Sequence, residues 1–141
     1  CIDNFIHTYA GVELRLKMHE IMTKQGHEEE TGKAKITSGY NLPAKYILHT
    51  VGPIIQWKVT KKDEELLASC YRECLRLAAD TGAESIAFCC LSTGVFRFPQ
   101  QRAAEIATNT VKQYLDKDNR IKKVIFNVFK DEDLKIYSGL L

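Results

Sequence analysis

The ten residues Cys90–Pro99 read CLSTGVFRFP and join two segments of different character. Their first two residues end ESIAFCCL (84–91), an apolar run that is typical of a buried strand. The residues after them, QQRAAEIATNTVKQYL (100–115), have the periodicity of a helix, with Pro99 at or near its first position. The stretch therefore predicts a loop that leaves a strand and enters a helix.

Outward from this loop, strands and helices alternate along the chain. Strands are expected at 34–40, 45–53, 84–91 and 122–129, and helices at 2–22, 63–81, 99–115 and 131–141. This alternation predicts an α/β fold in which helices cover a mostly parallel or mixed sheet. The segment 84–91 is apolar at consecutive positions, which predicts a central strand covered on both faces.

The composition limits which classes of protein and partner are expected. The 141 residues fit one soluble domain, and a net charge of +2 is too mild to indicate a nucleic-acid partner. No apolar run approaches the ~20 residues that cross a bilayer, so no membrane partner is expected. Four of the five cysteines lie inside apolar patterns, which indicates reduced thiols and a cytoplasmic protein. The chain opens at Cys1 without Met and already inside an amphipathic pattern, so we expect that a segment is missing before it.

The loop has the features of an anion site. Gly94 allows backbone angles that a side chain would forbid, so that successive N–H groups can turn toward one concavity. The following helix start adds positive potential, and phosphate is the natural ligand of such a loop. Ser92 and Thr93 could add hydroxyl hydrogen bonds, and Phe96 a flat surface. The alternative is an ordinary connection whose phenylalanines fill the core.

Three segments together resemble a macrodomain, the ADP-ribose-binding fold: AKITSGYNLPAKYILHTVGP (34–53), IAFCCLSTGVFRFPQQRAAEIA (86–107) and VIFNVFKDEDLKIY (124–137). The opening CIDNFIHTYAG (1–11) is similar to the family's first phosphate loop where it runs into a helix. The resemblance is strongest to the zinc-dependent, sirtuin-linked microbial macrodomains, in which a Cys, a His and a second Cys bind the metal. It also implies an upstream strand, an adenine-recognising acid, an Asn-Ala-Ala-Asn stretch and two further metal ligands, none of which this sequence contains.

The resemblance implies a three-layer α/β/α macrodomain over 1–141, with a mixed central sheet that lacks its first strands. It implies that the protein binds ADP-ribose and hydrolyses it from mono-ADP-ribosylated protein side chains, with carboxylate linkage expected. Asp3 would be catalytic, and Cys1 would be one ligand of a zinc ion whose other ligands lie upstream. ADP-ribose contacts are implied for Ile2, Asp3, Asn4, Ser92, Thr93, Gly94, Val95, Phe96 and Phe129.

Several alternatives stay open at this point. Asp3 could merely cap the first helix, and Phe129 could belong to the core rather than pack against adenosine. The protein could be a reader that binds ADP-ribose or a related metabolite without hydrolysis, or this piece could be inert. We expect a monomer, with Arg97 turned to solvent at the rim of the loop and Phe98 turned into the core.

Overall fold

The computed structural model describes residues 2–141, and its elements alternate as the sequence predicts. The order is α1 (Ile2–Ala10), α2 (Val12–Gln25), β1 (Ala34–Ser38), β2 (Tyr46–Thr50), α3 (Lys61–Asp80), β3 (Ser85–Phe88), α4 (Gln100–Lys117), β4 (Lys123–Phe126) and α5 (Asp131–Leu140). The α/β fold class is therefore confirmed, with strands shorter than the apolar runs that predicted them. None of the helices within residues 2–141 is long and apolar enough to span a bilayer.

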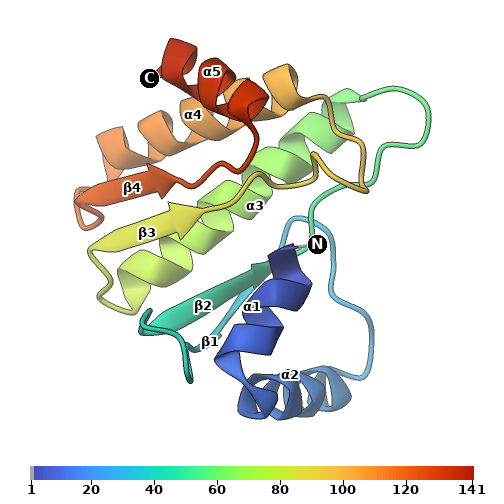
Figure 1. Cartoon of the computed structure of the whole chain (residues 1–141), viewed down its shortest axis with the longest axis vertical. Coiled ribbons are helices and arrows are strands. Elements are labelled where there is room, and N and C mark those ends of the chain that lie inside the picture. Colours follow the sequence, from blue (N-terminus) through green and yellow to red (C-terminus); the bar gives the residue numbers. More distant parts are fainter. Residues whose placement is uncertain (1) are drawn as a thin grey trace.

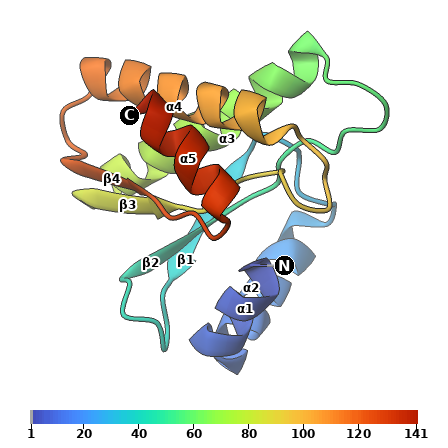
Figure 2. The ribbon, with the colours of Figure 1, turned by 45° about the horizontal axis from the view of Figure 1, so that its top comes forward.

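The elements form three layers (Figure 1). α1 and α2 lie on one side of the strands, and α3 crosses the other side, where it contacts β1, β2 and β3. α4 packs against α3, and α5 packs against α4, as the second view shows (Figure 2). The core lies between the strands and these helices, where Tyr71 meets Phe88 edge to face with ring centroids 4.9 Å apart.

The strands pair in two separate sets rather than in one continuous mixed sheet. β1 and β2 are antiparallel, with Ile36 opposite Leu48, whereas β3 and β4 are parallel, with Ala87 opposite Ile125. Within residues 2–141, no ladder joins the two sets. The prediction that the third strand is covered on both faces is wrong for this chain, because Ser85 and Ala87 are exposed while their neighbours are buried.

The helix expected over 2–22 is two helices. Gly11 separates them with a φ of 97°, in the region that favours glycine, so α1 cannot continue as a regular helix. A Cβ at this position would also lie 2.7 Å from Nδ2 of Asn41. The turn therefore places α1 at an angle to α2, with the first turn of α1 beside the strand ends (Figures 1 and 2).

Local signals explain where α3 begins. Thr60 caps it: the Thr60 hydroxyl accepts a hydrogen bond from the Asp63 amide, and the Asp63 carboxylate accepts one from the Thr60 amide. This reciprocal arrangement satisfies two N–H groups that a helix start leaves free. The helix therefore starts at Lys61, two residues before the sequence pattern predicts.

Candidate functional site

The loop between β3 and α4 is held in shape by its own backbone. The Arg97 amide donates to the Gly94 carbonyl at 3.0 Å, and the Phe98 amide donates to the Ser92 carbonyl at 2.9 Å. Ser92 and Arg97 adopt the left-handed conformation, with φ of 64° and 60°, and Gly94 does not. The expectation that Gly94 supplies the unusual backbone angle is therefore wrong; the bend is made at Ser92 and Arg97, at a cost of about 1–2 kcal/mol each.

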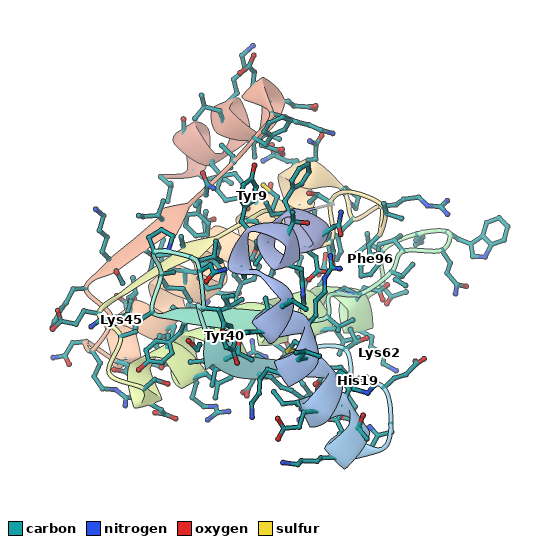
Figure 3. All side chains as sticks on the ribbon, turned by 60° about the horizontal axis from the view of Figure 1, so that its bottom comes forward. Tyr9, His19, Tyr40, Lys45, Lys62 and Phe96 are labelled. Atoms are coloured by element: carbon teal, nitrogen blue, oxygen red, sulfur yellow. The ribbon has the colours of Figure 1, made fainter. Side chains whose placement is uncertain are left out.

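The side chains of the loop divide between core and surface. Phe98 is buried, whereas Arg97 and Val95 are exposed, so the expected rim position of Arg97 and core position of Phe98 are confirmed. A Cβ at Gly94 would meet no atom within 4 Å, so space is open above this residue. Phe96 is half-buried and is labelled in the view that draws all side chains (Figure 3). The loop therefore presents Gly94, Val95 and Phe96 to the outside, as a binding loop would.

A close approach joins this loop to the chain that follows β2. A Cβ at Gly52 would lie only 1.9 Å from Oγ of Ser92, so that the two segments touch where only glycine fits. The Ile55 amide donates to the Phe96 carbonyl at 2.8 Å. Ser92 Oγ is buried in this contact without a hydrogen-bond partner. The loop after β3 is thus fixed against the loop after β2, at the carboxyl ends of both strands, where open α/β sheets bind ligands.

The start of α4 adds to this setting. Pro99 precedes the helix and provides no side-chain cap, and the first turn of α4 carries no acidic residue. The first N–H groups of a helix have no partner inside it and carry partial positive charge. The loop and the helix start together are suited to bind an anion.

Asp3 lies in the first turn of α1, on the same side of the molecule as this loop (Figures 1 and 2). Its side chain is 74% exposed, and its Oδ1 lies 3.7 Å from Nε2 of His7, one helical turn later. Among the contacts of residues 2–141, no amide of α1 donates a hydrogen bond to the Asp3 carboxylate, so the capping alternative gains no support there. Asp3 therefore has a free carboxylate that could hold a water.

The carboxylate opens onto a cavity of about 290 Å³ between α1, α2 and β2. His7 and His49 both line it, with ring centroids 6.2 Å apart. Nε2 of His49 lies 2.9 Å from the hydroxyl of Thr37. Burial lowers the pKa of His49, nearby His7 lowers it further, and Asp3 acts in the opposite direction. His49 is therefore held neutral beside the candidate catalytic carboxylate.

The predicted metal ligand Cys1 lies outside the described residues. Within residues 2–141, no three His, Cys, Asp or Glu side chains are placed to hold one metal ion. Cys70 and Cys74 are buried on α3, and burial raises the pKa of both thiols, that of Cys74 to about 12. Burial likewise raises the pKa of Cys90, to about 11. The described residues thus do not form a zinc site by themselves, and these thiols are kept protonated.

The remaining residues of the predicted site are accessible. Ile2 and Asn4 are exposed on α1, next to Asp3. Phe129 is 99% exposed in the connection between β4 and α5, so the alternative that it belongs to the core is wrong. A free aromatic ring at the carboxyl end of β4 is available to pack against a ligand.

The comparisons decide which family this geometry represents. A family model described as the Macro domain matches residues 1–107. The chain belongs to the macrodomain family. The match includes the opening segment 1–11 and two of the three segments that carry the resemblance, 34–53 and 86–107.

Solved macrodomains superpose on nearly all of this chain. A macrodomain of Oceanobacillus iheyensis with ADP superposes with a TM-score of 0.91 at 40% identity, over 99% of this chain and 73% of that one. A mutant of the same macrodomain with ADPR gives the same TM-score and identity. A Trypanosoma brucei macrodomain in complex with ADP superposes with a TM-score of 0.83 at 35% identity, over 99% of this chain and 55% of that one.

Two curated relatives carry the same description, protein-ADP-ribose hydrolase. That of Treponema medium is 58% identical over 141 residues, which is all of this chain and 54% of that protein. That of Staphylococcus aureus strain MRSA252 is 59% identical over 97% of this chain and 52% of that protein. The chain therefore spans about half the length of the curated relatives it matches.

Two features of this macrodomain were missed in the sequence. Gly52 falls near the end of the strand expected at 45–53, yet it is the point where the two loops meet. His49 falls inside the same expected strand, yet it faces the cavity beside Asp3. The dipeptide Gly52-Pro53 directly after a β-rich run was the available signal for the first; no local pattern distinguishes His49 from another strand residue.

Proposed function

We propose that this macrodomain binds ADP-ribose and hydrolyses it from mono-ADP-ribosylated protein side chains, with a carboxylate linkage. The observation that carries the proposal is the loop 92–96, clamped against the chain after β2 and followed by an uncapped helix start. The identity of about 58% to protein-ADP-ribose hydrolases over the full chain supports it. The ADP-ribosylated protein substrate of those relatives is proposed for this chain as well.

The binding half of the proposal assigns the diphosphate to the loop. Its amides and the start of α4 would neutralise phosphate charge, while the open space above Gly94 leaves room for the ligand. Phe129, exposed at the end of β4, would pack against the adenosine. The distal ribose would then lie toward Asp3 and Asn4 in the first turn of α1, which is on the same side of the molecule as the loop (Figures 1 and 2).

For the hydrolysis step, the proposal gives Asp3 the role of positioning the attacking water. Hydrolysis adds water across the bond between the ribose and the side-chain carboxylate, giving free ADP-ribose and the free carboxylate. The exposed Asp3 carboxylate would orient that water and accept its proton. His7, 3.7 Å from Asp3, would hold the carboxylate in place.

We further propose that the protein belongs with the zinc-dependent, sirtuin-linked macrodomains. Cys1 would supply one thiolate, and the other ligands would come from residues outside 2–141. A zinc ion bound there would act as a Lewis acid near the distal ribose. The roles given to Asp3 and to the loop do not depend on it.

The test is single-turnover release of ADP-ribose from a carrier protein modified on its carboxylates. Asp3→Ala should slow release by ~10²-fold or more, because a positioned proton acceptor is lost. ADP-ribose binding, measured by calorimetry, should change little.

Glu13→Ala is the matched control, because Glu13 is also a carboxylate in the first turn of a helix. This variant should release ADP-ribose at the normal rate. Equal rates for the wild type and Asp3→Ala would contradict the catalytic role, and tight binding without any release would favour the reader.

A further inference from the structure

The connection between β2 and α3 exposes large apolar side chains beside the binding loop. Trp57 is 96% exposed and Ile54 is exposed as well, whereas Ile55 is buried in the core. Single apolar residues are ordinary on a protein surface, but a tryptophan left almost wholly in water has a large area that contact with a partner would bury. The connection is therefore anchored by one apolar side chain and presents two others to the outside.

This connection is held in place at both of its ends. The Ile55 amide donates to the Phe96 carbonyl at 2.8 Å, and Thr60 forms the cap of α3 with Asp63. The connection projects from one end of the molecule, beside the loop between β3 and α4 (Figures 1 and 2). Val95 of that loop is exposed too. The exposed apolar side chains thus belong to two loops that are tied together at the carboxyl ends of the strands.

The same connection carries positive charge. Lys58, Lys61 and Lys62 are exposed, and none of them is in an ion pair among the residues that the structure describes. The segment 51–62 contains no Asp or Glu, and neither does the segment 85–104, which includes the binding loop. No acidic side chain of these two segments is therefore available to neutralise the three lysines.

The acidic residues that follow have other partners. Asp63 is held in the capping box of α3. Glu64 accepts hydrogen bonds from Arg102 at 2.6 and 3.0 Å, and Glu65 pairs with Arg72. The hydrogen bonds of these carboxylates thus go to the helix start and to arginines, which leaves the positive charge of the connection facing solvent.

The proposed reaction determines which partner comes to this end of the strands. ADP-ribose bound in the loop 92–96 would still be joined to its protein, so that protein would lie against the residues around the loop. A carboxylate linkage requires an Asp or Glu at the modified position. Tryptophan is prominent in protein interfaces, and a positive surface favours a negative one. Aliphatic Ile54 and Val95 beside Trp57 favour a protein over a nucleic acid, whose bases stack on aromatic rings.

We propose that residues 54–62 dock the protein that carries the ADP-ribose, through an acidic surface around its modified carboxylate. Trp57 would bury apolar area against the carrier protein, and the three lysines would pair with its carboxylates. The docking rests on the proposed function, because only a protein substrate extends beyond the ADP-ribose itself. Selection among modified proteins is thereby assigned to a segment outside the loop that would hold the diphosphate.

Calorimetry with the Asp3→Ala variant tests this, because that variant should bind normally and leave the modification on the carrier. The two ligands are free ADP-ribose and an acidic carrier protein mono-ADP-ribosylated on glutamate. The carrier should bind at least about tenfold more tightly than free ADP-ribose, and the difference should shrink as salt rises. Because no turnover is measured, a failure of the hydrolysis test would leave these affinities as they are, so the two failures are distinguishable.

Trp57→Ala in the same background separates docking from ADP-ribose binding. It should lower the affinity for the modified carrier by about tenfold or more and leave that for free ADP-ribose within about twofold. Leu141→Ala is the control, because it truncates another exposed apolar side chain, after α5. This control should change neither affinity.

Charge reversal tests the lysines. Lys58→Glu combined with Lys62→Glu should lower the affinity for the modified carrier by about tenfold at low salt and by less at high salt. Lys122→Glu combined with Lys123→Glu makes the same change in charge at the start of β4, the opposite end of the strands. This control should stay within about threefold, and circular dichroism checks the fold of every variant.

Four outcomes would overturn the proposal. The first is equal affinity for the modified carrier and for free ADP-ribose. The second is an equal loss for both ligands in Trp57→Ala, because Trp57 would then belong to the ADP-ribose site. The third is binding of single-stranded RNA that the lysine reversal abolishes while carrier binding is unchanged. The fourth is self-association that Trp57→Ala abolishes while carrier binding is unchanged, because the segment would then meet a second copy.

Discussion

Gly52 and Ser92 offer the sharpest test of how the binding loop is held. In Gly52→Ala, the new methyl group would lie 1.9 Å from Ser92 Oγ, 3.3 Å from Ser92 Cβ and 3.9 Å from its amide nitrogen. The backbone angles of Gly52 are open to alanine, so the cost comes from this contact alone. Overpacking a buried contact costs about 1–3 kcal/mol, and the loop after β3 must shift to relieve it.

Ser92→Ala removes the one atom that makes the severe contact. Because Ser92 Oγ is buried without a hydrogen-bond partner, its loss should be neutral or stabilising by up to about 1 kcal/mol. In this background, the nearest atom to the Gly52→Ala methyl group is Ser92 Cβ, at 3.3 Å. The second substitution should then cost less than about 1 kcal/mol.

Urea unfolding of the wild type, both single variants and the double variant gives the coupling free energy. We expect about 1–2 kcal/mol of favourable coupling, with ADP-ribose affinity reduced in Gly52→Ala and restored in the double variant. A coupling below about 0.5 kcal/mol would refute the claim that this contact positions the loop.

Two further predictions concern side chains of the loop, and a third concerns the pH dependence of stability. Arg97→Ala should weaken ADP-ribose binding by less than about tenfold, with a loss that shrinks as salt rises, because Arg97 is exposed at the rim. Gly94→Val should weaken ADP-ribose binding more, since the valine side chain would occupy the open space above the loop. Calorimetry at low and high salt separates the effects of the two variants. A larger and salt-independent loss of affinity for Arg97→Ala would contradict the rim position of Arg97. Burial lowers the pKa of His49 in the folded state, so below about pH 6.5 the unfolded state binds more protons. The stability that depends on neutral His49 is therefore present above about pH 6.5 and is lost as pH falls below this value through the lowered pKa of the folded state. The free energy of unfolding of wild type should therefore drop more steeply below about pH 6.5 than that of His49→Gln, and parallel curves would exclude this role.

The sequence predicts most elements of this macrodomain because their signals are local. The stripe on α3 and the apolar runs of β3 and β4 are each visible within a short window. The break at Gly11 was missed because Ile6, Ala10 and Leu14 keep helical spacing across it. Gly11 ends α1 because of its φ angle and its close approach to Asn41.

The site was predictable in its position but not in its internal geometry. The strand–loop–helix order placed Ser92–Phe96 correctly at a carboxyl end. The prediction that Gly94 makes the bend was wrong, because the left-handed residues are Ser92 and Arg97. Neither serine nor arginine is a residue type that favours this conformation. The order and direction in which the strands pair were likewise beyond any local pattern, since pairing depends on contacts between segments far apart in the chain.

The central claim is that the loop after β3 and the start of α1 hold one ADP-ribose between them. Calorimetry with ADP-ribose and with AMP under the same conditions tests it most directly, because AMP lacks the second phosphate and the distal ribose. We expect ADP-ribose to bind at least about tenfold more tightly, which corresponds to about 1.4 kcal/mol or more. Equal affinities for the two ligands would contradict a site that spans both segments.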